Sequence, residues 1–265
     1  MDAGQLRLGG GPAGGTRIEN AGTFVMAGDT RLVARSCCID PSVFANEGRL
    51  EKRGSPGDAE LWGVFVQNAG TVEVAQGRLV LSAGAEFGQS VGEMVLASAA
   101  AVAAKSVTMA GGALRGGGRI EGTLSNVAGE ISPGQGTGKL TVTGDFMQGR
   151  AGILRLELGG LVAGTESDLL EVTGTARLDG ERTIATVGAF RPALGEAVEV
   201  IRYGQRRGVF ARVTGLDLAE GLHLSARYED PTQLGQPGSL RLVARPTPLP
   251  AECRRAGAAP QLGGR

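Results

Sequence analysis

The sequence has few aromatic residues with which to organise a large core. Its 265 residues include only one Trp, two Tyr and seven Phe. A chain of this length can bury a substantial core, so small residues must fill it. Gly accounts for 46 residues, well above the usual share of about 7%, and it shows no three-residue period. The composition excludes collagen and favours a fold that packs small side chains closely.

Clustered charge and metal-binding spacings are lacking too. The formal net charge is zero, and no basic run is longer than the pairs Arg206-Arg207 and Arg254-Arg255, so we expect no nucleic-acid partner. His223 is the only histidine, which excludes a multi-histidine metal site within the chain. Cys37-Cys38 and Cys253 fit no C-x-x-C spacing and are expected to be incidental thiols.

Signals for export or membrane insertion are absent from the sequence. The N-terminal residues lead straight into the Gly-rich run Gly9 to Gly15, without a basic start and an apolar stretch. The longest apolar stretch, Met94 to Ala104, falls well short of the roughly 20 residues that cross a bilayer. We expect no membrane-spanning segment in this chain.

A short phrase recurs in the N-terminal half: an apolar residue, a spacer, Asn, one or two small or polar residues, Gly, and then an alternating strand. The first three copies are 26 and 22 residues apart, which suits one turn of a coil built from two or three short strands. Asn and Gly are expected at the bends because both tolerate positive φ. The predicted structural bends are Asn20, Gly22, Asn46, Gly48, Asn68 and Gly70, with a looser copy at Asn126 and further bends at Gly134 and Gly144.

Between the bends, apolar and polar residues alternate with period two, which is typical of strands with one buried and one wet face. Thr71-Val72-Glu73-Val74 is an example. The positions predicted to point inward are Val72, Val74, Leu79, Leu81, Leu154, Leu156, Leu158, Leu170, Val172, Val198, Val200, Leu222 and Leu224.

The segment Glu93 to Lys105 is ambiguous. Its alanines favour a helix of about three turns on local propensity. Its place in the series, about one period after Gln67 to Ala83, instead favours another rung whose Ala side chains pack inside a narrow coil. We favour the strand and keep the helix as the alternative.

Changes in composition and in the pattern of predicted strands divide the chain into three parts. Residues 1–122 are predicted to be a repeat β-solenoid, and residues 123–245 a β-rich section with longer and more regular strands. Residues 246–265 begin with Pro-Thr-Pro-Leu-Pro and have no periodicity, so a disordered Pro/Ala/Gly tail is expected there.

Three phrases in the second section resemble a known family. They are Gly129-Glu130-Ile131-Ser132-Pro133-Gly134, Gly138 to Phe146 (GKLTVTGDF) and Asp168 to Ala176 (DLLEVTGTA). They look like the C-terminal passenger region of autotransporter-type bacterial surface proteins. The later Gly208-Val209-Phe210 and Gly215-Leu216 are similar to a turn of the same region, and the resemblance covers about residues 17 to 245.

The resemblance implies a β-helix in an exported protein, located at the cell surface or secreted. It implies an unknown surface receptor or extracellular polymer as partner and identifies no ligand. Because the expected export signal is missing, the chain is expected to be a fragment or to be exported by another route.

Two apparent catalytic patterns fail on inspection. PGQGTGKLT (Pro133 to Thr141) suggests a phosphate-binding loop, but Pro133 occupies the position of the first Gly and Leu140 that of the hydroxyl residue. Asp168, Asp179 and Asp217 stand beside strand ends, where Asp accepts backbone hydrogen bonds. Turn formation is therefore favoured over a glycosidase-like carboxylate pair.

The sequence thus predicts an all-β parallel β-helix or β-solenoid with no catalytic residues, cofactor or metal. The leading hypothesis is a non-catalytic structural stalk or display segment of an exported, adhesin-like surface protein. One alternative is a polysaccharide-binding or polysaccharide-cleaving β-helix, although Trp62, Tyr203 and Tyr228 lie far apart in sequence. The other is a truncated fragment without independent function.

Overall fold

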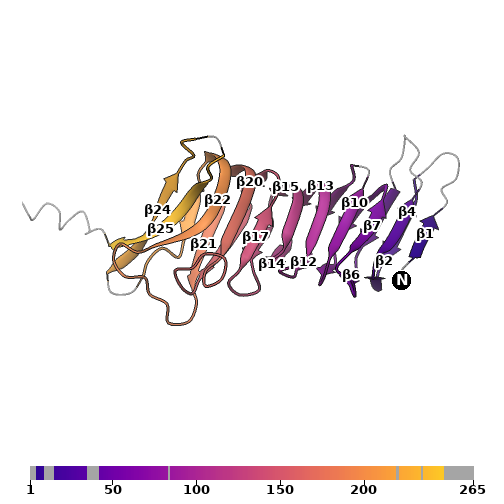
Figure 1. The fold of residues 1–265 in the computed structure, drawn as a ribbon, viewed down its shortest axis with the longest axis horizontal. Coiled ribbons are helices and arrows are strands. Elements are labelled where there is room, and N and C mark those ends of the chain that lie inside the picture. Colours follow the sequence, from indigo (N-terminus) through magenta and orange to yellow (C-terminus); the bar gives the residue numbers. More distant parts are fainter. Residues whose placement is uncertain are drawn as a thin grey trace, which may run out of the picture.

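The strands of this protein stack side by side along one long axis (Figure 1). The computed structural model describes residues 4–8, 15–34, 42–82, 84–218, 221–233 and 235–247. The secondary structure within those residues consists of β-strands alone. These strands pair in parallel, except that the last two strands form antiparallel pairs. The prediction of an all-β solenoid is confirmed. The three cysteines, which are expected to be incidental thiols, lie outside the described residues.

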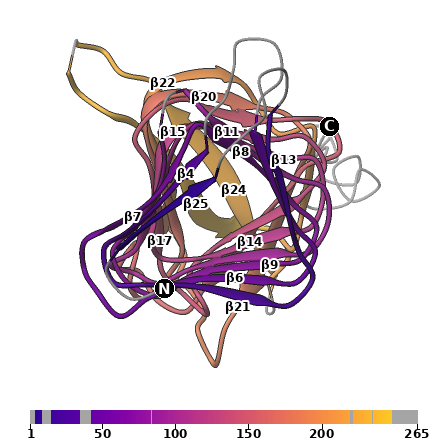
Figure 2. The ribbon, with the colours of Figure 1, turned by 90° about the vertical axis from the view of Figure 1, so that its right-hand side faces the viewer.

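The chain winds around three faces, which Figure 2 shows from nearly along the axis. The first face contains β1 (Gly4–Leu8), β4 (Thr30–Ala34), β7 (Asp58–Trp62), β10 (Arg78–Ser82), β17 (Lys139–Val142) and the first halves of β13 (Ala101–Met109), β15 (Arg119–Asn126), β20 (Leu169–Leu178) and β22 (Ala197–Gly208). The second face contains β2 (Arg17–Asn20), β5 (Ser42–Asn46), β8 (Val64–Asn68), β11 (Glu86–Gln89), β18 (Phe146–Gln148) and the second halves of those four long strands. The third face contains β3 (Thr23–Ala27), β6 (Arg49–Arg53), β9 (Thr71–Val74), β12 (Glu93–Leu96), β14 (Ala113–Gly116), β16 (Glu130–Pro133), β19 (Ile153–Leu158), β21 (Glu181–Thr186) and β23 (Arg212–Thr214).

The core is the interior of this coil. Side chains alternate along each strand, so every second residue points to the axis, where it packs on its equivalents in the rungs above and below. Of the positions predicted to point inward, all but Leu222 are buried. Leu222 is half-buried because it begins a strand of the terminal hairpin instead of a rung.

Glu93 to Lys105 forms strands and no helix. It becomes β12, a turn at Ser98-Ala99, and the beginning of β13. Ala100, Ala101 and Ala104 are buried. Stacking between neighbouring rungs thus outweighs the helix propensity of alanine, which is worth less than about 1 kcal/mol per residue.

The C-terminal end of the coil is closed by an antiparallel hairpin, which the sequence analysis did not predict. β25 (Gly238–Pro246) pairs antiparallel with β22, and β24 (Leu222–Glu229) pairs antiparallel with β25. Tyr203 of β22 donates a hydrogen bond to the Ser239 carbonyl at 2.9 Å, and Arg206 forms an ion pair with Asp230 at 2.6 Å. These contacts attach the hairpin to the last rung. β15 meanwhile runs across residue 122, the predicted division between the first two sections.

Arg182 is a fully buried cation beneath this closed end. Its guanidinium lies 5.3 Å from the Phe210 ring centroid, and its nitrogens have no hydrogen-bond partner among the described residues. Burial lowers the pKa of Arg182, and the Tyr228 hydroxyl acts in the opposite direction. Burial of a charge without an ionic partner costs several kcal/mol of desolvation free energy. A cation–π contact is worth about 2 kcal/mol, so the contact with Phe210 offsets only part of this desolvation cost.

We predict that Leu156→Asp lowers the free energy of unfolding by more than about 3 kcal/mol, since it removes a buried leucine and strips a carboxylate of water. Leu156 is fully buried, whereas the neighbouring Glu157 side chain points outward. Urea unfolding followed by circular dichroism measures the difference. Glu157→Asp serves as the control and should shift the midpoint little; equal effects of the two substitutions would contradict the assigned register.

Candidate functional site

The most regular polar feature of the coil is a column of side-chain amides at one corner, between the second and third faces. Asn20, Asn46 and Asn68 occupy equivalent positions in successive rungs. The Asn20 Nδ2 donates to Asn46 Oδ1 at 2.6 Å, and Asn46 Nδ2 donates to Asn68 Oδ1 at 2.7 Å. We call this column the amide ladder. All three side chains are buried, so each amide takes its hydrogen bonds from the neighbouring rungs instead of from water.

Backbone hydrogen bonds turn the chain at the same corner. The amides of Glu47 and Gly48 both donate to the carbonyl of Asn20, at 2.9 and 2.8 Å. Asn20 Nδ2 also donates to the Arg49 carbonyl at 3.0 Å. The rung of Asn68 repeats the arrangement, with Ala69 and Gly70 donating to Asn46. The bend is therefore held by the adjacent rung, because its polar groups bond along the coil axis.

The amide ladder is longer than the sequence analysis predicted. Asn68 Nδ2 donates to Gln89 Oε1 at 3.1 Å, and Asn126 Nδ2 donates to Gln148 Oε1 at 3.0 Å. Met109 stands between Gln89 and Asn126 in register and interrupts the ladder. The two glutamines were missed, although Phe87-Gly88-Gln89-Ser90-Val91-Gly92 repeats the apolar residue, spacer and glycine with Gln in place of Asn.

Close approach of the backbone requires glycine at two of the three positions after the ladder residues, Gly48 and Gly70, so the expected reason, a positive φ, was wrong for them. Gly22, Gly48 and Gly70 are not among the glycines with positive φ. A Cβ on Gly48 would lie 2.1 Å from the Gly22 carbonyl oxygen, and a Cβ on Gly70 would lie 2.1 Å from that of Gly48. The same column of close contacts continues through Gly92 and Gly112. Unlike Gly48 and Gly70, these two glycines have positive φ in addition to the close contact.

The other two predicted bends, Gly134 and Gly144, differ in their physical basis. Gly134 has φ of +96° in the turn after β16, a conformation that favours glycine. Gly144 lies between β17 and β18, where a Cβ would be 2.6 Å from the Gly122 carbonyl oxygen. A second column of close-packed glycines thus follows the bend between the first and second faces.

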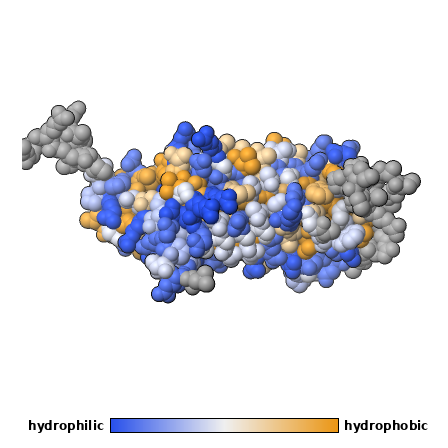
Figure 3. Space-filling model, turned by 90° about the horizontal axis from the view of Figure 1, so that it is seen from above, coloured by the Kyte–Doolittle hydropathy of each residue, from blue (hydrophilic) through white to orange (hydrophobic). Residues whose placement is uncertain are grey.

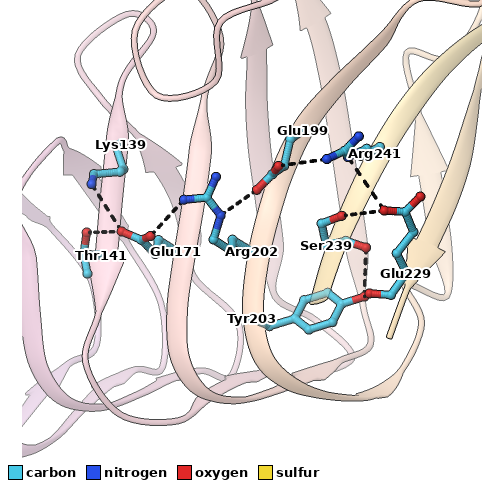
Figure 4. A network of polar contacts seen from close by, with 9 residues as sticks. All are labelled: Lys139, Thr141, Glu171, Glu199, Arg202, Tyr203, Glu229, Ser239 and Arg241. Atoms are coloured by element: carbon cyan, nitrogen blue, oxygen red, sulfur yellow. Dashed lines mark hydrogen bonds and ion pairs between the residues drawn. The ribbon is translucent and has the colours of Figure 1, made fainter. Parts of the chain in front are cut away.

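The outer surface of the first face carries a row of ion pairs (Figure 4), whose members lie on β17, β20, β22, β25 and β24. We call this row the charged stripe. Its distances are 3.2 Å for Lys139–Glu171 and Glu171–Arg202, 2.8 Å for Arg202–Glu199, 3.6 Å for Glu199–Arg241 and 3.9 Å for Arg241–Glu229. Burial raises the pKa of Glu171, but the hydrogen bonds and charges of Lys139 and Arg202 outweigh it, so the net direction is down. Positive and negative charges alternate along the stripe, which leaves no surplus of either sign for a charged ligand.

Asp168 holds two faces of the coil together. Its Oδ1 accepts a hydrogen bond from the Gly138 amide and its Oδ2 one from the Glu157 amide, both at 2.8 Å. The side chain is fully buried, and this burial raises its pKa to about 7 despite the two amide donors. Asp168 therefore acts at a turn, as expected, but joins segments that are distant in sequence. Asp179 accepts from the Gly180 amide at 2.8 Å, also as expected of a turn residue.

The remaining sequence-based candidates are not brought together. Lys139 of the apparent phosphate-binding loop begins β17, and its amine pairs with Glu171. His223 lies on β24 with its Nδ1 buried and without a hydrogen-bond partner among the described residues. No group of three or more His, Cys, Asp or Glu in the described part of the chain could hold a metal ion.

Among the residues that the structure describes, four surface hollows are each lined by one carboxylate and by no aromatic residue. The carboxylates are Glu73, Asp179, Glu121 and Glu171. A carboxylate-based glycosidase site requires two carboxyl groups about 5 to 10 Å apart. Trp62 lies elsewhere, 37% exposed, beneath the guanidinium of Arg31.

The surface view in Figure 3 shows hydrophilic residues interspersed with small hydrophobic areas. Within the residues that the structure describes, no helix has the length and apolar character needed to cross a membrane.

The fold and the amide ladder define a parallel β-solenoid with an antiparallel C-terminal hairpin. Comparison with protein-family models and with curated proteins found no match to this chain.

We predict that Gly70→Val lowers the free energy of unfolding by about 3 kcal/mol, because the new Cβ overlaps the backbone of the preceding rung. Thr71→Val is the matched control. Thr71 begins β9 and is half-buried, so this change should stay within about 0.5 kcal/mol. Chemical denaturation monitored by far-ultraviolet circular dichroism compares the two. A tolerated valine at residue 70 would show that the rungs are not closely stacked at this corner.

We predict that the contribution of Asp168 to the free energy of unfolding falls as the pH rises from about 4 to about 7. Its folded pKa is about 7, above its usual value of 3.8. Between these two pKa values the folded state keeps a proton that the unfolded state has lost. The contribution of Asp168 to the free energy of unfolding is therefore fully present below the pKa of the unfolded state, and it is lost as the pH rises through the pKa of the folded state. Asp168→Asn should remove this component, at most about 1.4 kcal/mol per pH unit. Unfolding curves of the wild type and of Asp168→Asn at several pH values test it, and an unchanged pH dependence in the variant would contradict the prediction.

Proposed function

We propose that this chain is a non-catalytic stalk or display segment of an exported, adhesin-like bacterial surface protein. The observation that carries the proposal is the use of the corner amides for stacking: the polar side chains of the ladder bond to neighbouring rungs, and the structure gains length with each rung. The nine strands described on the third face, spaced by about 4.8 Å, make this part of the coil roughly 40 Å long.

The surface chemistry supports a structural role over the polysaccharide-cleaving alternative. Each of the four hollows has a single carboxylate and lacks the aromatic platform on which sugar rings stack. The charged stripe is neutralised internally, and Asp168 is occupied by two backbone amides. The resemblance of residues 129–176 to the passenger region of autotransporter-type proteins supports export and surface display.

The test is the location of the chain on its source cells. Antibodies raised against the purified chain are expected to label intact cells, and external protease is expected to abolish that labelling. Lysed cells and an antibody against a cytosolic protein provide the controls. Labelling that appears only after lysis would contradict surface display, and hydrolysis of a polysaccharide by the purified chain would contradict a purely structural role.

A further inference from the structure

A hollow of about 640 Å³ lies on the outer side of the second face, close to the corner with the third face. It is the one lined by Asp179 among the four hollows described above. The strands beneath it are β15, β18, β20 and β22. Clefts that bind ligands commonly have volumes of about 300 to 1,000 Å³, so this hollow has the size of a ligand site.

One end of the hollow is apolar. Val127 follows β15 and is 48% exposed, and Met147 of β18 is half-buried. Met147 alternates with the buried Phe146 and Gln148, so its side chain points to the outer side of the strand. Covering these two side chains with an apolar group would remove apolar surface from water, which is favourable.

The other end of the hollow carries two arginines on adjacent strands. Arg177 of β20 and Arg207 of β22 are exposed and in register, so their backbones are about 4.8 Å apart. Like charges that face each other on neighbouring strands are destabilising. An anion bound between the two guanidinium groups would remove this repulsion.

Neither arginine has a partner within the described part of the chain. The side chains of Arg177 and Arg207 form no hydrogen bond, ion pair or ring contact there. Arg115 on the third face shows the usual arrangement in this protein, since it pairs with Glu93 at 2.9 Å and with Glu130 at 3.2 Å. The hollow is therefore a place where the pairing of surface charges is incomplete.

Arg150 adds to the positive charge of the hollow. Its side chain is 95% exposed, and its Nε lies 4.0 Å from Asp179 Oδ2. Asp179 also accepts the hydrogen bond of the Gly180 amide. Three guanidinium groups and one carboxylate line the hollow, which leaves a surplus of two positive charges beside the apolar end.

We propose that this hollow binds a short acidic segment of another protein, in which an apolar residue is followed by two acidic residues at alternate positions. From Val127 to Arg207 the hollow spans three rung steps of about 4.8 Å, or about 14 Å. An extended peptide covers about 13 Å in four residue steps, and its first, third and fifth side chains point the same way. The apolar side chain would lie on Val127 and Met147, and the carboxylates would accept bidentate hydrogen bonds from Arg177 and Arg207.

The apolar end favours a peptide over an acidic polysaccharide. Pockets for such ligands are lined largely by hydrophobic and aromatic side chains, yet no aromatic residue on which a sugar ring could stack lines this hollow. The flexible, polarisable side chain of methionine instead adapts to the irregular shape of an aliphatic partner. The inference concerns the purified chain and does not depend on where the protein is located in the cell.

The experiment adds a fluorescent pentapeptide, leucine-serine-glutamate-serine-glutamate with an amidated C-terminus, to the whole chain at low salt. We expect saturable binding by fluorescence anisotropy. Arg177→Gln and Arg207→Gln should each weaken it at least about tenfold, because a charge-assisted hydrogen bond is lost. Arg155→Gln is the matched control and should bind as the wild type does, since Arg155 lies on the third face and also lacks an ion pair among the described residues.

Two further peptides test the chemistry of the partner. Replacing both glutamates by glutamine should abolish binding. Replacing the leucine by serine should weaken it at least about fourfold, the effect of losing about one buried methylene group. Equal binding of the leucine and serine peptides, or tighter and arginine-dependent binding of polygalacturonate, would overturn the assignment of an acidic peptide. Absence of saturable binding, or equal loss with Arg155→Gln, would overturn the site itself.

Melting curves separate this role of Arg177 from a structural one. Arg177→Gln removes one of two like charges on neighbouring strands, so the melting temperature should stay unchanged or rise. A clear fall would show that Arg177 has partners within the chain, and the inference would then fail. Addition of the glutamate peptide should raise the melting temperature of the wild type and leave that of Arg177→Gln unchanged.

Discussion

Hydrogen bonding from one rung to the next is the interaction on which the whole structure depends. At the corner between the second and third faces, the side-chain amides of Asn46 and Asn68 and the backbone amides that follow them bond to a neighbouring rung. A single rung cannot satisfy these groups or bury its apolar face, so it has no stability by itself. Cohesion comes from repetition, which explains how a chain with so few aromatic residues holds together.

The close approach of the rungs sets a second constraint. Gly48 and Gly70 leave no space for a side chain, and Gly144 and Gly122 repeat this at another bend. The abundance of glycine therefore reflects close spacing between backbones as well as freedom of φ. The surface ion pairs play a smaller part, since exposed pairs are worth about 0 to 1 kcal/mol each. Their alternation explains how a protein with 27 basic and 27 acidic residues stays neutral along the charged stripe as well as overall.

The sequence predicted the coil because the features that specify it are local and repeated. Alternation identified buried positions such as Leu156, and the spacing of Asn20, Asn46 and Asn68 identified the corner. Gln89 was missed because a longer side chain fills the same role and hides the repeat. The antiparallel hairpin was missed because alternation at Leu222 to Leu224 is the same in parallel and antiparallel strands. Asp168 was expected at a turn, but its contacts with Gly138 and Glu157 depend on how three distant segments fold together.

Met109 divides the amide ladder into two parts. Its thioether stands where the other rungs around it have an amide, so it can neither donate nor accept in the manner of Asn or Gln. Hydrogen-bonded amides polarise one another along a chain, and that polarisation cannot pass a residue that does not take part. The coil thus contains two arrays of side-chain amides, Asn20 to Gln89 and Asn126 to Gln148. Across the step between them the Gln89 amide donates to the Ala113 carbonyl at 2.9 Å instead of to another side-chain amide, and backbone pairing and packing supply the rest of the cohesion.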